Sequence, residues 1–185
     1  MTFKRIAAPL SDEDIMELKA GDTVLISGVI YTGRDAAHAK LAELVKAGEP
    51  LPVDFKGQMI YYVGPSPAKP GKVIGSAGPT TSGRMDAYTP MMLEQGLKAC
   101  IGKGNRKQSV KDALVKHKGV YMAATGGAAA LLAKTIKKAE VVAYPELGAE
   151  SIYKLEVEDF PATVINDAYG NDIYEEGRKQ YAIND

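Results

Sequence analysis

Three short loops of this sequence carry the side chains that could do chemistry. Each loop combines glycine with a cationic side chain and a hydroxyl or amide group. The loops are TGRD at 32–35, GPTTSGR at 78–84 and GKGNR at 102–106. A guanidinium grips a carboxylate through two parallel hydrogen bonds, and an ammonium group adds a point charge. If the loops meet, Arg34, Arg84 and Lys103 would suit a small dicarboxylic acid.

Each of these cations also has a purely structural interpretation. Arg34 directly precedes Asp35, so the two could form a surface ion pair, which is common and contributes little to stability. Arg84 has the same alternative with Asp86. Lys103 stands between two glycines, as in many surface turns, and the hydroxyls of the second loop could close turns or cap a helix. Neither of the longer loops matches a dinucleotide fingerprint or a P-loop.

The elements that must position these loops alternate between strands and helices. Runs of β-branched and apolar residues predict strands, and a 3.6-residue periodicity predicts helices. Strands are expected at 23–31, 59–63, 72–76, 99–101, 119–124, 141–144, 152–157 and 163–166. Helices are expected at 11–19, 36–46, 89–98 and 107–116, in an alanine-rich run ending at 134, and at the C-terminal end. This alternation predicts an α/β fold with a mixed sheet flanked by helices, in which loops leaving the strands line one crevice.

The composition excludes several classes of protein. The chain has 185 residues, of which 45% are hydrophobic and 25% charged, so we expect a single globular domain over 1–185. Its 23 basic and 23 acidic residues cancel, which disfavours nucleic acid and anionic membranes as partners. Without a signal sequence or an apolar run of ~20 residues, the chain is expected to be cytoplasmic.

Metal chemistry would need a partner. An iron–sulfur cluster usually takes three or four thiolates, and this chain has only Cys100, which we expect to be an inert core thiol. The two histidines, His38 and His117, lack zinc-ligand spacing. We expect His38 on the polar side of its helix, where it is either solvated or bonded to Asp35 or a ligand. His117 should be solvated at a helix end.

The three motifs, read as 32–38, 78–86 and 102–105, closely resemble those of class I iron–sulfur hydro-lyases. The resemblance is to the C-terminal domain or separate β subunit of fumarase, and it extends from about Pro9 to Asp172. The related β subunit of L-tartrate dehydratase resembles the chain less. In that branch the first motif has cysteine at the position of Gly33, and the positions of Ser82-Gly83 and Asn105 differ.

The resemblance implies a swivelling β/β/α domain that closes over a cluster-bearing α subunit. Three cysteines of that subunit would hold a [4Fe–4S] cluster with one iron open to substrate, and this chain would bind no metal. The implied reaction is the reversible hydration of fumarate to (S)-malate, active only with the α subunit. Three alternatives stay open: a tartrate dehydratase, a mesaconate hydratase, and a non-catalytic anion-binding module. The isolated chain could also form a homodimer.

The resemblance also implies roles for individual residues. Arg34, Arg84 and Lys103 would hold the dicarboxylate, with Arg84 counted among the catalytic residues. Thr80 and Thr81 would contact the substrate near its reacting carbons, and Thr80 is the implied catalytic base. An ordinary threonine hydroxyl is far too weak a base for a carbon-bound proton, so Thr80 would have to become an alkoxide or relay to another base.

Overall fold

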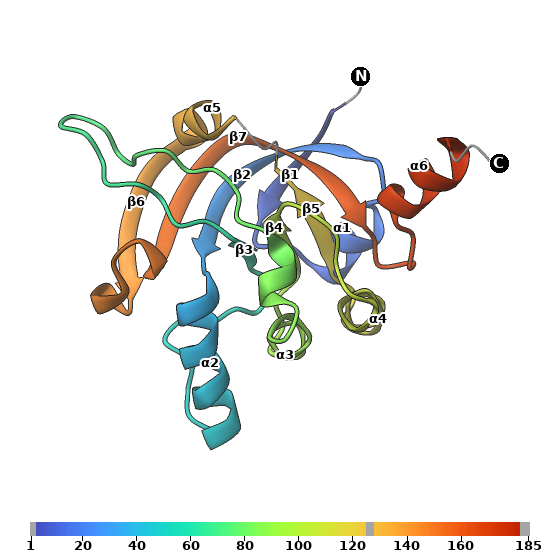
Figure 1. Cartoon of the computed structure of the whole chain (residues 1–185), viewed down its shortest axis with the longest axis horizontal. Helices are drawn as coiled ribbons and strands as arrows, with labels where there is room; N and C mark the ends of the chain where they lie inside the picture. The colour runs from blue at the N-terminus through green and yellow to red at the C-terminus, as the bar shows by residue number, and fades with distance from the viewer. Residues whose placement is uncertain (1–2, 125–127, 182–185) are drawn as a thin grey trace.

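The computed structural model describes residues 3–124 and 128–181, and its strands form one curved sheet with helices around it (Figure 1). The strands are β1 (Phe3–Ala8), β2 (Thr23–Thr32), β3 (Met59–Tyr61), β4 (Ala99–Gly102), β5 (Val120–Ala123), β6 (Ile136–Ala143) and β7 (Ile152–Asn166). The helices are α1 (Asp12–Met16), α2 (Asp35–Ala47), α3 (Thr89–Glu94), α4 (Gln108–His117), α5 (Ala129–Thr135) and α6 (Ile173–Tyr181). Two 3₁₀ helices, η1 (Ser82–Met85) and η2 (Pro145–Glu150), complete the described elements.

The middle of the sheet closes on itself because β7 pairs along both of its edges. The strand order is β1-β2-β3-β4-β5-β7-β6, and β2 additionally pairs with β7. Neighbours from β1 to β5 are parallel, whereas β7 runs antiparallel to β2, β5 and β6. Thr163 lies opposite Thr23 of β2 and opposite Ala123 of β5. Strands β2, β3, β4, β5 and β7 therefore form a closed barrel, extended by β1 and β6.

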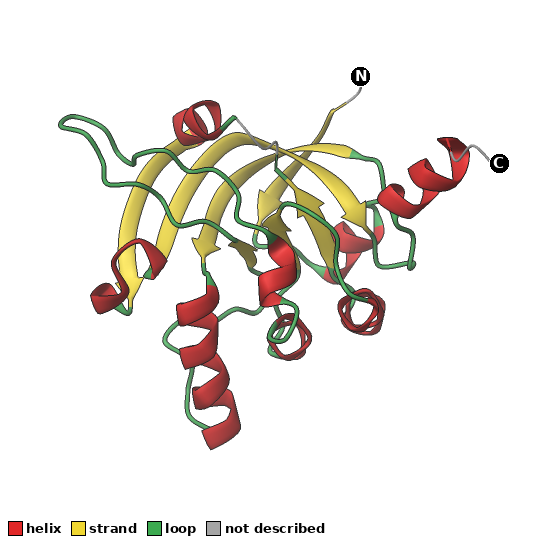
Figure 2. Ribbon diagram, in the orientation of Figure 1, coloured by secondary structure: helices red, strands yellow, loops and turns green. Residues whose placement is uncertain are grey.

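Alternate residues of each strand face two separate cores. Met59 and Tyr61 point into the barrel with residues such as Phe160 of β7, whereas Ile60 and Tyr62 point outward. The outward face is covered by α2, α3 and α4, which lie together on one side of the sheet in Figure 2. The mixed α/β fold with a sheet and flanking helices is confirmed.

Three expectations about the strands are wrong, and β1 has no counterpart among the expected strands. The strand expected at 141–144 begins earlier, as β6 at Ile136. The predicted strand at 72–76 does not form, and residues 64–78 instead make a long irregular loop that extends away from the barrel (Figure 1). The predicted strands at 152–157 and 163–166 are one strand, β7. Pro161 lies inside this strand. The strand bends just before it, where Asp159 has a left-handed φ of 52° and the pairing register shifts opposite Ile26 and Gly28.

Two helices also differ from expectation. Helix α3 ends at Glu94 rather than at 98, because Gly96 turns the chain with a φ of 95°. Thr89 is its first residue rather than its cap, and the Thr89 hydroxyl donates to the Met85 carbonyl at 2.9 Å. Helix α1 is short, and Ser11 caps it with a reciprocal hydrogen bond to Asp14.

Candidate active site

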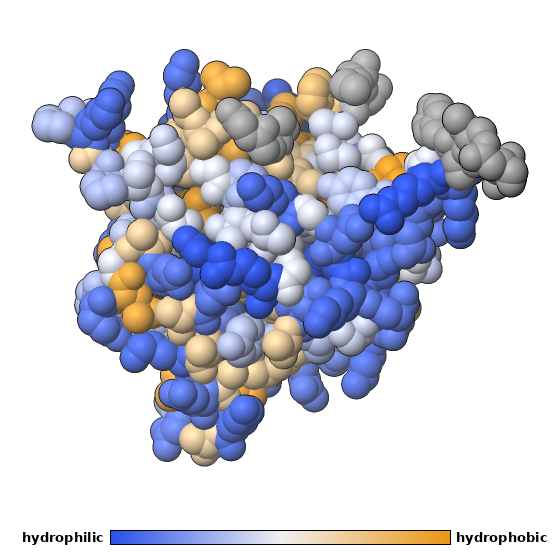
Figure 3. Space-filling model, viewed as in Figure 1, coloured by the Kyte–Doolittle hydropathy of each residue, from blue (hydrophilic) through white to orange (hydrophobic). Residues whose placement is uncertain are grey.

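The three glycine-containing loops meet at the carboxyl ends of β2, β3 and β4. These strands are parallel neighbours, so their carboxyl ends lie at one edge of the barrel. Beyond β3, the Thr80 amide donates to the Tyr62 carbonyl at 2.7 Å, which returns the long loop to this edge. Thr81 then forms a parallel bridge with Lys103, and the Ser82 amide donates to the Lys103 carbonyl at 2.9 Å. Figure 3 shows a strongly hydrophilic strip across this region, between the start of α2 and α3.

Two guanidinium groups flank the carboxylate of Asp35. Arg84 donates from Nε to Asp35 Oδ1 at 2.9 Å, and Arg34 Nη2 lies 3.8 Å from Asp35 Oδ2. Arg84 therefore pairs with Asp35 from another loop and not with its near neighbour Asp86. The Arg84 side chain is 53% exposed, so its remaining N–H groups face solvent.

Arg34 is held more deeply than Arg84. Its side chain is 22% exposed, and Nη2 lies 3.3 Å from Glu150 Oε1. Glu150 also accepts a 3.0 Å hydrogen bond from the Ala36 amide in the first turn of α2. Gly64 leaves the room for the guanidinium, since a Cβ there would lie 2.7 Å from Arg34 Nη1. Sequence reasoning missed both Glu150 and Gly64, because no local motif connects them to Arg34.

Lys103 and the two threonines present unpaired polar groups. Lys103 and Thr81 are exposed and Thr80 is half-buried. Lys103 lies beside a shallow cleft of about 460 Å³, which it lines with residues including Thr163 and Tyr174. Among the residues that the structure describes, neither threonine hydroxyl makes a hydrogen bond and Lys103 has no ion pair. The structure thus places the loops of all five residues at one edge of the barrel, although the cleft that Lys103 lines contains none of the other four.

A buried layer of polar side chains lies directly beneath these loops. Ser82 Oγ is 3.0 Å from Tyr121 Oη, which donates to the Gly104 carbonyl at 2.8 Å. Arg106, whose side chain is fully buried, pairs with Asp86. Sequence reasoning did not single out Arg106, although it ends the third loop. The only signal was its position between two elements with buried apolar residues, β4 and α4.

The expectation for His38 is wrong. Its side chain is fully buried, with Nδ1 2.8 Å from the Arg34 carbonyl and the ring packed against Tyr62 and Tyr88. Burial lowers the pKa of His38 to about 4, so the ring is neutral near pH 7. The physical reason is that α2 turns this face of its first turn toward β3 and away from solvent.

The expected position of Cys100 in the core is confirmed. It is fully buried in β4, and burial raises the pKa of the thiol above its usual range. The described part of the chain contains no group of three or more His, Cys, Asp or Glu residues that could hold a metal ion. These residues therefore do not fit an iron–sulfur cluster. None of the described helices is long and apolar enough to cross a membrane.

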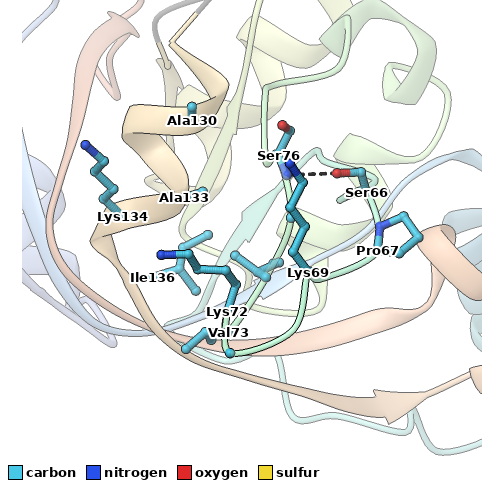
Figure 4. Close-up of a pocket in the computed structure, with 13 residues that line it drawn as sticks. Ser66, Pro67, Lys69, Lys72, Val73, Ser76, Ala130, Ala133, Lys134 and Ile136 are labelled. Atoms are coloured by element: carbon cyan, nitrogen blue, oxygen red, sulfur yellow. Dashed lines mark hydrogen bonds between the residues drawn. The ribbon is translucent and has the colours of Figure 1, made fainter.

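Another cleft lies away from the three loops. It has a volume of about 420 Å³ and lies between residues 66–76 and α5, with Lys69, Lys72 and Lys134 around it (Figure 4). Two hydrogen bonds hold its loop side together: the Ser76 amide donates to Ser66 Oγ at 2.8 Å, and the Ser66 amide donates to the Ser76 carbonyl at 3.0 Å. The described residues that line it include no carboxylate, histidine or guanidinium. The loops at the strand ends remain the better candidate, because two guanidinium groups lie there and none is among the described residues that line this cleft.

Comparisons with known proteins agree on one family. The family model described as "Fumarase C-terminus" matches residues 3–177. "Fumarate hydratase class I, anaerobic" of Escherichia coli (strain K12) is 50% identical over 176 residues, which are 94% of this chain and 31% of that protein. "Fumarate hydratase 2" of Leishmania major is 44% identical over 88% of this chain and 29% of that protein. The chain spans about a third of the length of these two relatives.

A third relative has nearly the same length as this chain. "Putative L(+)-tartrate dehydratase subunit beta" of Methanocaldococcus jannaschii is 41% identical over 177 residues. The match covers 92% of this chain and 91% of that protein.

Proposed function

Because this chain belongs to the fumarase C-terminus family, we propose that it is the β subunit of a heteromeric iron–sulfur hydro-lyase. The proposed reaction is the reversible addition of water across the double bond of fumarate to give (S)-malate. The observation that carries the proposal is the convergence of Arg34, Arg84 and Lys103 from three loops at one edge of the barrel.

The cations bind the two carboxylates of the substrate. Asp35 engages Arg84 through Nε, which leaves both terminal nitrogens of that guanidinium free to grip a carboxylate side by side. Arg34 is partly neutralised by Glu150, and Lys103 adds a charge across the Thr81 bridge. Three cations facing Asp35 and Glu150 leave an excess of positive charge for a dianion. The same charges stabilise the negative charge that grows on a carboxylate when the neighbouring carbon loses its proton.

Thr80 and Thr81 contact the substrate near its reacting carbons. The Thr80 backbone is fixed by its hydrogen bond to Tyr62, and Arg84 follows four residues later in the same loop. Thr80 is proposed to accept the carbon-bound proton. A guanidinium nearby favours the alkoxide that this role requires, although a relay through a second base serves the same purpose.

The [4Fe–4S] cluster belongs, in this proposal, to a partner α subunit. In this chain Cys100 is buried in β4, and the described residues offer no set of ligands for a cluster. The roles proposed for this chain are therefore substrate binding and proton transfer. The relative named "subunit beta" supports a partner subunit, because that name describes one chain of a heteromer. The two-thirds of the fumarate hydratases that this chain does not match would correspond to the partner.

Anaerobic reconstitution tests the proposal. The chain is mixed with a cognate α chain that carries a loaded cluster, and fumarate hydration is followed by the loss of absorbance of the double bond. Activity is expected only in the mixture. A fully loaded complex that leaves fumarate unchanged would contradict the proposed reaction.

A tartrate or methyl-substituted substrate is the second candidate, and the 41% identity to a protein named tartrate dehydratase subunit beta favours tartrate. Comparing rates on fumarate, L-tartrate and mesaconate in the same complex separates these substrates. Binding of malate by the isolated chain, together with an inactive complex, would instead identify an anion-binding module without catalysis.

A further inference from the structure

The most completely buried ion pair among the described residues lies beneath the candidate site. Arg106 Nε donates to Asp86 Oδ1 at 2.7 Å, and their side chains are 0% and 3% exposed. The second oxygen of Asp86 accepts the Lys107 amide at 2.9 Å. Arg106 Nη2 donates to Thr89 Oγ1 at 2.6 Å. The pair therefore joins the end of the second loop to the end of the third.

Aromatic rings hold the guanidinium in place. Its carbon lies 4.8 Å from the ring centroid of Tyr121 in β5 and 5.4 Å from that of Tyr62 beyond β3. Burial raises the pKa of both tyrosines, so both hydroxyls stay protonated and available as donors. Tyr121 uses its hydroxyl on Gly104, next to Lys103, and also contacts Ser82, next to Thr81. Two parts of the same network thus reach the backbone on either side of the Thr81–Lys103 bridge.

Stability alone is a poor explanation for such a pair. Desolvating two charges is expensive, and well-packed apolar residues of similar volume are often as stable or more so. Arg106 also leaves one buried group, Nη1, without a hydrogen-bond partner among the described residues. The planar guanidinium of Arg106, however, fixes both the distance and the direction of its hydrogen-bond partners, whereas an apolar contact does not fix direction.

We infer that Arg106 and Asp86 are positioning residues that set the separation between the Thr80–Arg84 loop and Lys103. This inference rests on the proposed function, because that separation matters when one ligand must reach Arg84 and Lys103 together. Neither residue needs to touch the ligand. Their effect reaches it through Ser82, Gly104 and the backbone bridge between Thr81 and Lys103.

The test uses Arg106→Lys and Asp86→Asn in the full chain. Arg106→Lys keeps the charge but loses the fork that bonds Asp86 and Thr89 at once. Lys98→Met is the matched control, because Lys98 forms a 2.7 Å ion pair with Asp12 and is only 14% exposed. It precedes β4, at the opposite end of the strand from Lys103.

Calorimetry then compares (S)-malate with the monocarboxylate lactate at a temperature where every variant is folded. In both site variants the separation between Arg84 and Lys103 should no longer be fixed, which should weaken malate binding by about 10- to 100-fold. Lactate binding should stay nearly unchanged, because one carboxylate needs only one cation. Lys98→Met should leave both affinities unchanged. Equal losses for both ligands, or no loss for either, would overturn the inference.

Hydrogen exchange supplies a measurement that needs no ligand. In both site variants, amides at 80–86 and 102–107 should exchange about tenfold faster or more, whereas in Lys98→Met they should not. Unchanged exchange in those segments would overturn the inference. If the reconstituted complex leaves fumarate unchanged, the proposed function fails, while the exchange result still decides whether the pair fixes the two loops.

Discussion

Replacing Gly64 with alanine would move the Arg34 guanidinium while leaving the charge and the hydrogen-bond donors of Arg34 unchanged. The new Cβ would lie 2.7 Å from Arg34 Nη1 and 3.1 Å from its Cδ, whereas ordinary contact begins at 3.4 Å. The guanidinium must therefore retreat by about 0.7 Å, which is enough to break a hydrogen bond of normal length. Because the nearest atom is the end of a long side chain, the fold itself can adjust.

The expected effect on binding is large compared with the effect on folding. A hydrogen bond to a charged group contributes about 1.5–3 kcal/mol, so its loss weakens dicarboxylate binding by about 10- to 150-fold. Gly64 does not adopt a left-handed φ, so alanine reduces the entropy of the unfolded chain and changes the free energy of unfolding by less than about 1 kcal/mol.

Calorimetric titration of (S)-malate into the full chain measures the first quantity, and thermal denaturation measures the second. Gly177→Ala in α6 is the control, because a methyl group there meets nothing within 4 Å. Wild-type affinity in Gly64→Ala would remove Arg34 from the binding site. A weakened affinity accompanied by a lower melting temperature would show that the substitution acts through folding instead.

Three further predictions follow from single side chains. Arg84→Lys should lower the turnover of the reconstituted complex by about 100-fold or more despite the retained charge, because an ammonium cannot grip a carboxylate with two parallel bonds; near-normal turnover would exclude Arg84 from the site. Burial lowers the pKa of His38 to about 4 from 6.5, so below pH 6.5 the unfolded chain binds a proton that the folded chain refuses. The free energy of unfolding should therefore fall by about 3 kcal/mol between pH 6.5 and 4, with no contribution above that range. Urea denaturation at pH 7 and pH 5 should show a smaller difference in His38→Gln than in the wild type. Cys100 should react with a thiol reagent only in denaturant, because its thiol is buried and its pKa is raised; rapid labelling of the folded chain would show that β4 is not in the core.

The sequence predicted the loops well because their signals are local. The run from Thr23 to Tyr31 is rich in β-branched residues, and Gly48 ends the following helix in a left-handed conformation, as expected of a cap. The parallel order of β2, β3 and β4 then brings their carboxyl ends to one edge. That order explains why the loops of Arg34 and Lys103 share an edge. The loop of Arg84 reaches the same edge through the Thr80–Tyr62 hydrogen bond, because the strand expected at 72–76 does not form.

Features that depend on distant residues could not be predicted in the same way. The partner of Arg106 is 20 positions away, and Glu150 meets the start of α2 from 114 positions away. His38 was misplaced because its position on α2 looks polar from helical periodicity, whereas Tyr62 and Tyr88 arrive from other elements to cover it. The 72–76 segment contains two apolar residues in strand-like order, but the glycines beside them and the absence of a neighbouring strand leave it irregular.

Closure of the barrel by β7 has a consequence for how the protein is made. The bond from the Asp159 amide to Ser27 Oγ joins residues 132 positions apart, and the whole β2–β7 seam has a similar separation. A ribosome releases the chain from its N-terminus, so β2 is synthesised long before the strand that covers its second edge. During that interval the nascent chain exposes an unpaired strand edge, and large sequence separation slows folding. Translation pauses after residue 166 should therefore raise the yield of native protein, whereas pauses within 60–120 should raise aggregation.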